Sequence, residues 1–252
     1  MENALLVGLS RQMALARELD VVANNIANVD TAGFKGRTTV FQEYVSPTAK
    51  AETFPRPDQR VSYVWDRGTA LNYSQGAVEQ TGNPLNVAIN GDALFVVKQG
   101  GADRYTRDGG FNVNGKGELV TSSGLPVQTD QGTVTFTDQD SDIRILADGT
   151  VASIQAGQFQ TKGKLKLVTF ANKQNLRNEG SNVFSSSDQP TPAKPEETRL
   201  QTASVEKSNV KSITEMTRMI EINRNYQAVS NMISNTDTLR RTAISRLADQ
   251  QA

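Results

Sequence analysis

Three alternating aspartates are the side chains in this sequence whose spacing most resembles a metal site. Asp138, Asp140 and Asp142 in "DQDSD" have the spacing with which a calcium-binding loop begins. An EF-hand loop then requires glycine at its sixth position and glutamate at its twelfth, where this chain has Ile143 and Gly149. The pattern therefore favours a solvated acidic turn, and we predict neither a bound metal nor a cofactor.

The residue types needed for most side-chain catalysis are missing. The chain contains no histidine and no cysteine, which removes the commonest general base, thiolate nucleophiles and the Ser-His-Asp triad. "NGKGELV" has Val120 where a dinucleotide loop needs its last glycine, and "GLSRQ" has Gln12 where a nucleophile elbow needs glycine. Paired carboxylates alone can hydrolyse glycosides, so a secreted carbohydrate-acting enzyme is kept as an alternative. Asp103 and Asp108 lie beside turn glycines, where aspartate is common for backbone reasons, and we predict that the chain is not an enzyme.

Composition limits the partners further. The 252 residues include 27 basic and 27 acidic side chains, so no net field attracts nucleic acid or an anionic membrane. No apolar run approaches the roughly 18 residues that could cross a bilayer. Glu2 stands where a signal peptide needs positive charge, and Gly8 and Ser10 interrupt the apolar run. We expect no nucleic-acid partner, no direct membrane insertion and no cleaved signal peptide.

The longest elements that the sequence predicts are two helices, one at each end of the chain. A helix is predicted from about Asn3 to Val29, because apolar residues recur there three and four apart. No glycine or proline follows Pro195, and we predict a second helix over Ala203–Asp249. Each helix has a wide apolar face, which only packing against another element can bury. Gly33 is expected to adopt the left-handed conformation after the first helix, with Phe34 folding back.

Between the ends the apolar period changes to two, as in strands. Short β-type runs alternate with the turn dipeptides Asn90-Gly91, Asp108-Gly109, Asn114-Gly115 and Asp148-Gly149, which suit tight turns with positive φ. The predicted fold class is α+β, with long N- and C-terminal helices forming a coiled-coil-like inner layer and a central, mainly antiparallel β domain. The expected segments are an N-terminal assembly helix (1–34), an extended connector containing Pro47, Pro55 and Pro57 (35–76), the β domain (77–186), a proline-rich linker (187–200) and a C-terminal assembly helix (201–252).

Asparagines within the helices carry the most specific pattern. "ANNIANVDTAGFK" at 23–35 resembles the N-terminal signature of the flagellar axial proteins, the rod and hook family. Three further stretches are similar to that family and occur in the same order: "TGNPLNVAINGDALFVV" (81–97), "RYTRDGGFNVNGKGELVTSSGLPV" (104–127) and "MIEINRNYQAVSNMI" (219–233). The length and the opening residues are most like the proximal-rod members, with the distal-rod members as the alternative.

The resemblance implies a structural role. Such proteins are exported through the flagellar type III apparatus without a cleaved signal peptide and assemble helically into the rod, which crosses the periplasm and transmits motor torque. The implied partners are copies of the chain itself, other rod proteins and the export apparatus. Buried asparagines would fix the register between subunits, since each misaligned amide loses hydrogen bonds worth about 1–3 kcal/mol. The expected assembly residues are Leu5, Leu9, Leu15, Leu19, Val22, Asn24, Asn25, Ile26, Asn28, Gly33, Phe34, Ile213, Met216, Met219, Ile220, Ile222, Asn223, Tyr226, Val229 and Ile233.

Overall fold

The computed structural model describes residues 2–46, 61–196 and 198–249. The chain forms two compact units. We call the first the helix–hairpin unit; it comprises Met1–Ala27, Arg37–Leu71 and Lys211–Ala252. The second, the β-rich unit, comprises Asn28–Gly36 and Asn72–Val210. The predicted α+β class, with a helix at each end and a mostly antiparallel β domain between them, is confirmed.

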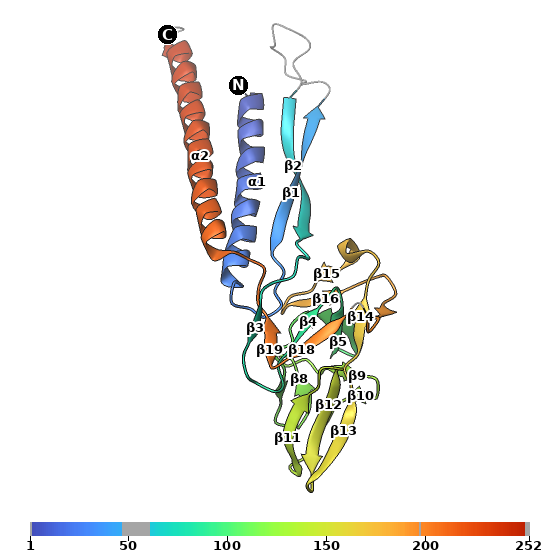
Figure 1. The fold of residues 1–252 in the computed structure, drawn as a ribbon. Helices are drawn as coiled ribbons and strands as arrows, with labels where there is room; N and C mark the ends of the chain where they lie inside the picture. Colours follow the sequence, from blue (N-terminus) through green and yellow to red (C-terminus); the bar gives the residue numbers. More distant parts are fainter. Residues whose placement is uncertain (1, 47–60, 197, 250–252) are drawn as a thin grey trace. The chain divides into compact units, whose positions relative to one another are not determined.

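The helix–hairpin unit contains helices α1 (Glu2–Ala27) and α2 (Ser212–Asp249) and strands β1 (Arg37–Ser46) and β2 (Val61–Leu71). The strands pair antiparallel from Arg37↔Leu71 to Ser46↔Val61, with a register shift after Val40. Helix α1 lies between α2 and this hairpin and contacts both (Figure 1). Within the described part of the chain, neither helix combines the length and the apolarity needed to cross a membrane.

Both predicted helices are shorter in the structure. Helix α1 ends at Ala27 instead of Val29, and α2 begins at Ser212, so the expected start at Ala203 is wrong. The residues before α2 form β18 (Arg199–Thr202) and β19 (Ser204–Glu206), which pair with β4 (Val87–Asn90) and β3 (Val78–Gln80). A segment without glycine or proline is free to form a strand as well as a helix, and here pairing with distant strands decides.

The β-rich unit is built from short antiparallel strands. A six-stranded sheet has the order β15-β16-β6-β5-β14-β17, and the remaining strands form two- and three-stranded sheets. Its core is centred on Phe95 and Phe111, whose rings meet edge to face at 5.0 Å. The other strands are β5 (Leu94–Gln99), β6 (Ala102–Thr106), β7 (Asn112–Val113), β8 (Leu119–Val120), β9 (Gln128–Thr129), β10 (Gly132–Thr133), β11 (Asp140–Ile145), β12 (Thr150–Gln155), β13 (Gln158–Lys164), β14 (Leu167–Thr169), β15 (Arg177–Asn178), β16 (Val183–Ser185) and β17 (Thr191–Pro192).

The turn glycines follow the predictions only in part. Gly91 and Gly149 have positive φ, 124° and 87°, as expected. Gly109 and Gly115 do not. Gly109 is required for space instead, because a Cβ there would lie 1.7 Å from the carbonyl oxygen of Val87.

The two segments expected to be connectors contain strands. The connector over 35–76 includes the β1–β2 hairpin; its prolines at 47, 55 and 57 lie outside the described residues. The expected linker over 187–200 includes β17, which extends the six-stranded sheet by pairing with β14, and the first residues of β18. Its Glu197 also lies outside the described residues. Proline fits β17 because that strand lies at the sheet edge.

Candidate assembly interface

The two helices meet along one apolar seam. Leu15 and Val22 of α1 are buried against Ile222 and Val229 of α2, and Leu19, Ile26, Met219, Tyr226 and Ile233 pack around them. All nine were predicted as assembly residues, and the structure places them between the helices of a single chain. Gly8 allows the helices to approach closely, since a Cβ there would lie 3.1 Å from Cγ1 of Ile233.

Asn25 connects three elements of the helix–hairpin unit. Its side chain is 3% exposed. Its Nδ2 donates to the carbonyl oxygen of Arg37 at 2.8 Å and to Oε2 of Glu215 at 3.1 Å, and its Oδ1 accepts from the Arg37 amide at 2.9 Å. The amide therefore holds the start of β1 and the first turn of α2 on α1. These partners lie in the same chain, whereas the sequence led us to expect partners on another one.

The other predicted asparagines lie in different surroundings. Asn24 and Asn223 are exposed, and Asn223 accepts a hydrogen bond from Gln227 one turn later. Asn28 accepts from the Thr31 hydroxyl and closes the turn that follows α1. An ion pair that sequence reasoning missed lies beside the seam, where Arg218 donates to Oε1 of Glu18 at 2.6 Å and 3.1 Å.

Gly33 and Phe34 belong to the β-rich unit. Gly33 has a φ of 66°, which confirms the left-handed conformation predicted for it. Its amide donates to the carbonyl oxygen of Glu206 at 2.7 Å, so it pairs with β19 instead of capping α1. A Cβ on Gly33 would lie 2.4 Å from the backbone carbon of Arg107. Phe34 is buried in this unit, at 4% exposure.

A buried ion cluster follows directly after this turn. The carboxylate of Glu206, 1% exposed, accepts from Lys35 Nζ at 2.6 Å and from Arg107 Nε at 2.5 Å. Gly76 donates its amide to the same carboxylate at 2.9 Å, and Lys35 also donates to the carbonyl oxygen of Ser74. Three distant parts of the chain thus meet at one carboxylate. Sequence reasoning missed the cluster, although Lys35 ends the asparagine motif and Arg107 lies in "TRDGG".

The charges in this cluster depend on each other. Burial acts to raise the pKa of Glu206, but the charge of Arg107 and the hydrogen bond from Lys35 outweigh it and hold that pKa below its ordinary value. Burial lowers the pKa of Lys35 in spite of its hydrogen bond to Glu206. Glu206 therefore stabilises the fold mainly as an anion between two cations.

Each helix also has an apolar stripe that its own chain leaves exposed. On α1 we define the α1 outer stripe as Leu6, Leu9 and Met13, which are 51%, 50% and 66% exposed. On α2 we define the α2 outer stripe as Ile213, Met216 and Ile220, which are 80%, 51% and 55% exposed. Leu9 and the three α2 residues were predicted as assembly residues, whereas Leu6 and Met13 were missed; Leu5 is half-buried.

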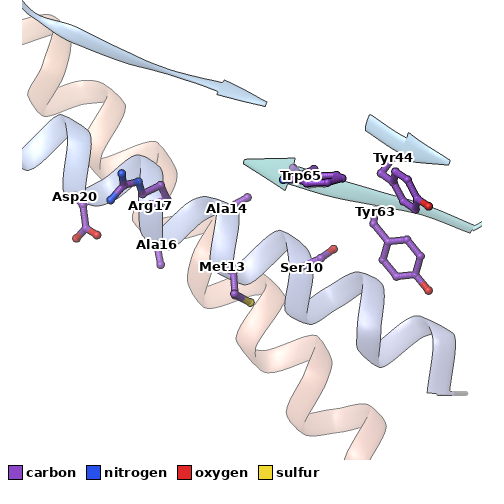
Figure 2. Close-up of a pocket in the computed structure, with 10 residues that line it drawn as sticks. Ser10, Met13, Ala14, Ala16, Arg17, Asp20, Tyr44, Tyr63 and Trp65 are labelled. Carbon is purple, nitrogen blue, oxygen red and sulfur yellow. The ribbon is translucent and has the colours of Figure 1, made fainter. Parts of the chain in front are cut away.

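An apolar groove adjoins the α1 outer stripe (Figure 2). It has a volume of about 740 Å³ and lies between α1 and the hairpin, with Met13 and Ala14 on one side and Tyr44, Tyr63 and Trp65 on the other. Trp65 is 63% exposed and meets Tyr44 edge to face at 5.9 Å. Exposed aromatic and methionine side chains of this kind are typical of surfaces that bind another protein.

Of the three alternating aspartates, expected in a turn, Asp140 and Asp142 lie in β11 and bind partners within the chain. Asp140 is bonded to Lys162 at 2.8 Å and to the Ser153 hydroxyl at 2.7 Å, and these contacts lower the pKa of Asp140. Asp142 pairs with Arg144. Among the described residues, no three acidic side chains converge in a way that could hold a metal ion.

Two paired terminal helices with exposed apolar stripes, together with a β-rich unit, fit the class of structural subunits. Residues 5–35 match the family described as flagella basal body rod protein, residues 88–153 match the flagellar hook protein FlgE/F/G D1 domain, and residues 201–246 match the flagellar basal body rod FlgEFG protein C-terminal region. The chain belongs to the flagellar basal-body rod protein family, and it is a structural subunit of the basal-body rod.

Full-length relatives support the assignment. The chain is 39% identical over 250 residues to the flagellar basal-body rod protein FlgF of Caulobacter vibrioides, covering 98% of both chains. It is 31% identical over 252 residues to FlgF of Mesorhizobium japonicum, covering 99% of this chain and 100% of the relative. It is 32% identical over 255 residues to the flagellar basal-body rod protein FlgG of Bacillus subtilis, covering 95% and 97%. Membership of this family implies a location in the basal body and assembly with other rod subunits.

Proposed function

We propose that this chain is a proximal-rod subunit that assembles helically through α1 and α2, within the periplasm, and transmits motor torque. The observation that carries the proposal is the pair of uncovered apolar stripes on helices whose opposite faces are already joined in the seam. Burying such stripes on neighbouring subunits is favourable at about 25 cal/mol per Å² of apolar surface. In this role the chain has no catalytic activity.

Ile220→Asp tests the role of the exposed face. Ile220 lies outside the seam, so the charge should leave the chain folded but prevent its burial between subunits. In a strain lacking the native gene, the variant should fail to restore swimming in soft agar and should leave basal bodies without a complete rod. The matched control is Thr214→Asp, an exposed position on another side of α2, which should swim normally. A motile Ile220→Asp strain would contradict the proposed assembly.

The position along the rod needs a separate measurement. Identity to FlgF reaches 39% and identity to FlgG 32%, which supports the proximal assignment and leaves the distal rod as the alternative. Gold labelling of a tagged chain in isolated basal bodies should place it at the membrane end of the rod. Label at the hook end would assign it to the distal rod.

Export belongs to the same proposal. The chain is exported by the flagellar type III apparatus and keeps its N-terminal residues. A strain with an inactive export apparatus should retain the chain in the cytoplasm. Intact-mass measurement on chain recovered from basal bodies should show the first helix complete, whereas loss of an N-terminal segment would contradict uncleaved export.

A further inference from the structure

We propose that the α2 outer stripe of one copy packs antiparallel on the α1 outer stripe of a second copy, in one defined register. This inference rests on the proposed function and names the surfaces that join two subunits. Leu6 would face Ile220, Leu9 would face Met216, and Met13 would face Ile213.

The two stripes have the same spacing. Each begins at a residue i and continues at i+3 and i+7, so each occupies a narrow strip of about 60° on its helix. When two such stripes run antiparallel, their end residues pair directly and their middle residues fall within one residue of each other. All six side chains are large, apolar and at least half exposed. The match therefore brings six exposed apolar side chains into one contact.

The stripes cannot meet within one chain. At 100° per residue, each outer stripe is centred roughly 140° around its helix from the seam residues. Side chains that point away from the seam on both helices cannot turn toward each other while the seam is formed. A second copy of the chain supplies the missing partner without disturbing the seam.

The register also defines a displacement between copies. Within the chain, Gly8 of α1 lies against Ile233 of α2. In the proposed contact, the α2 position that faces Gly8 lies about 15 residues before Ile233, nearer the start of α2. This difference corresponds to about 23 Å along the helix axis. A contact that joins two different surfaces with an axial displacement does not close into a dimer, so it continues into a helix of subunits.

The groove beside the α1 outer stripe offers a site for Ile213, the most exposed large apolar side chain among the described residues of α2. Ile213 is 80% exposed, and the register places it next to Met13, which lines the groove. Tyr44 and Trp65 form the opposite wall, so the Ile213 side chain would be enclosed between the hairpin aromatics and α1 (Figure 2). The hairpin would thereby contribute to the contact between copies.

Cysteine cross-linking tests the register directly, because the natural chain contains no cysteine. A disulfide forms only when the two Cα atoms lie within about 7 Å, so the test tolerates little error in register. Met13→Cys combined with Ile213→Cys, and separately Leu6→Cys combined with Ile220→Cys, should give dimers and higher multimers on non-reducing gels of oxidised basal bodies. The matched control combines Met13→Cys with Ile220→Cys, two positions that the register keeps about 10 Å apart or more, and should remain monomeric.

The outcomes separate this inference from the proposed function. If the cysteine variants swim normally but neither pair cross-links, or if the control pair cross-links equally, the register is overturned while the rod function stands. If deletion of the gene leaves swimming intact, the proposed function itself fails. A photo-reactive benzoylphenylalanine at Met13 gives a second measurement: a cross-linked peptide containing Ile213 supports the contact, and a peptide from another rod protein or another segment overturns it.

Discussion

Removing the charge of Glu206 should destabilise the β-rich unit more than any surface change. Glu206→Gln keeps the shape of the side chain but leaves Lys35 and Arg107 as two buried cations without an anion. Removing one partner of a buried ion pair costs about 3–5 kcal/mol. The glutamine amide keeps one acceptor oxygen, so one hydrogen bond to a cation is lost, at about 1.5–3 kcal/mol, and the other no longer has a charged acceptor. The folding equilibrium should therefore fall at least about a hundredfold.

Urea unfolding of the purified chain measures this loss. Far-ultraviolet circular dichroism follows both units, whereas the fluorescence of Trp65, the only tryptophan, follows the helix–hairpin unit. The dichroism signal that is lost separately from the fluorescence change reports on the β-rich unit. In the variant, the urea midpoint of that transition should be lower, and the dependence of its unfolding free energy on urea concentration should change little.

Two comparison variants identify the cause. Glu79→Gln, on the β3 strand that pairs with β19, removes an exposed ion pair with Lys207, the residue after Glu206, and should leave the midpoint unchanged. Adding Lys35→Met to Glu206→Gln removes one of the two buried cations that are left without an anion, and should recover part of the lost stability. A Glu206→Gln loss below about 1 kcal/mol, or an equal loss in Glu79→Gln, would refute the view that the cluster holds this unit together.

Four further predictions concern the ion cluster, Gly33, Asn25 and the seam. Because the pKa of Glu206 in the folded chain lies below its ordinary value of 4.5, its stabilising effect is complete above about pH 4.5 and is lost as the pH falls through the folded pKa. Below about pH 4.5, the urea midpoint of Glu206→Gln should therefore depend less on pH than that of the natural chain. Gly33→Ala should cost about 1–3 kcal/mol or more in the same assay, since its φ of 66° and the Arg107 backbone both oppose a Cβ. Asn25→Ala should cost about 1–3 kcal/mol, measured by Trp65 fluorescence, because the Arg37 amide loses its acceptor. Leu15→Ala should lower the stability of the isolated chain by about 2–5 kcal/mol. Leu6→Ala should leave the stability of the isolated chain unchanged and impair only rod assembly in cells. Equal effects of the two variants would contradict the distinction between the seam and the outer stripe.

The residues of the asparagine motif contribute to both units of the chain. The first part of the motif ends α1, and Asn25 joins α1 to β1 and α2. Its second part, from Asn28 to Lys35, folds with the β-rich unit, where Lys35 binds Glu206. The sequence predicted a specific role for these residues, but Glu215, which binds Asn25, and Glu206, which binds Lys35, lie 190 and 171 positions away in the chain. No pattern within the motif identifies partners at that distance.

What the sequence alone determined is the part of the fold that depends on neighbours in the chain. The 3.6-residue period predicted both helices and all nine residues of their seam, the period of two predicted the β domain, and Gly33 was correctly expected at positive φ. Tertiary structure decided that residues 199–206 form strands and that Glu206 binds two cations. It also decided which apolar stripe of α1 and of α2 is buried in the seam and which stays exposed. The physical reason is that periodicity marks a helix face as apolar, whereas the element that covers the face is set by packing between segments far apart in the sequence.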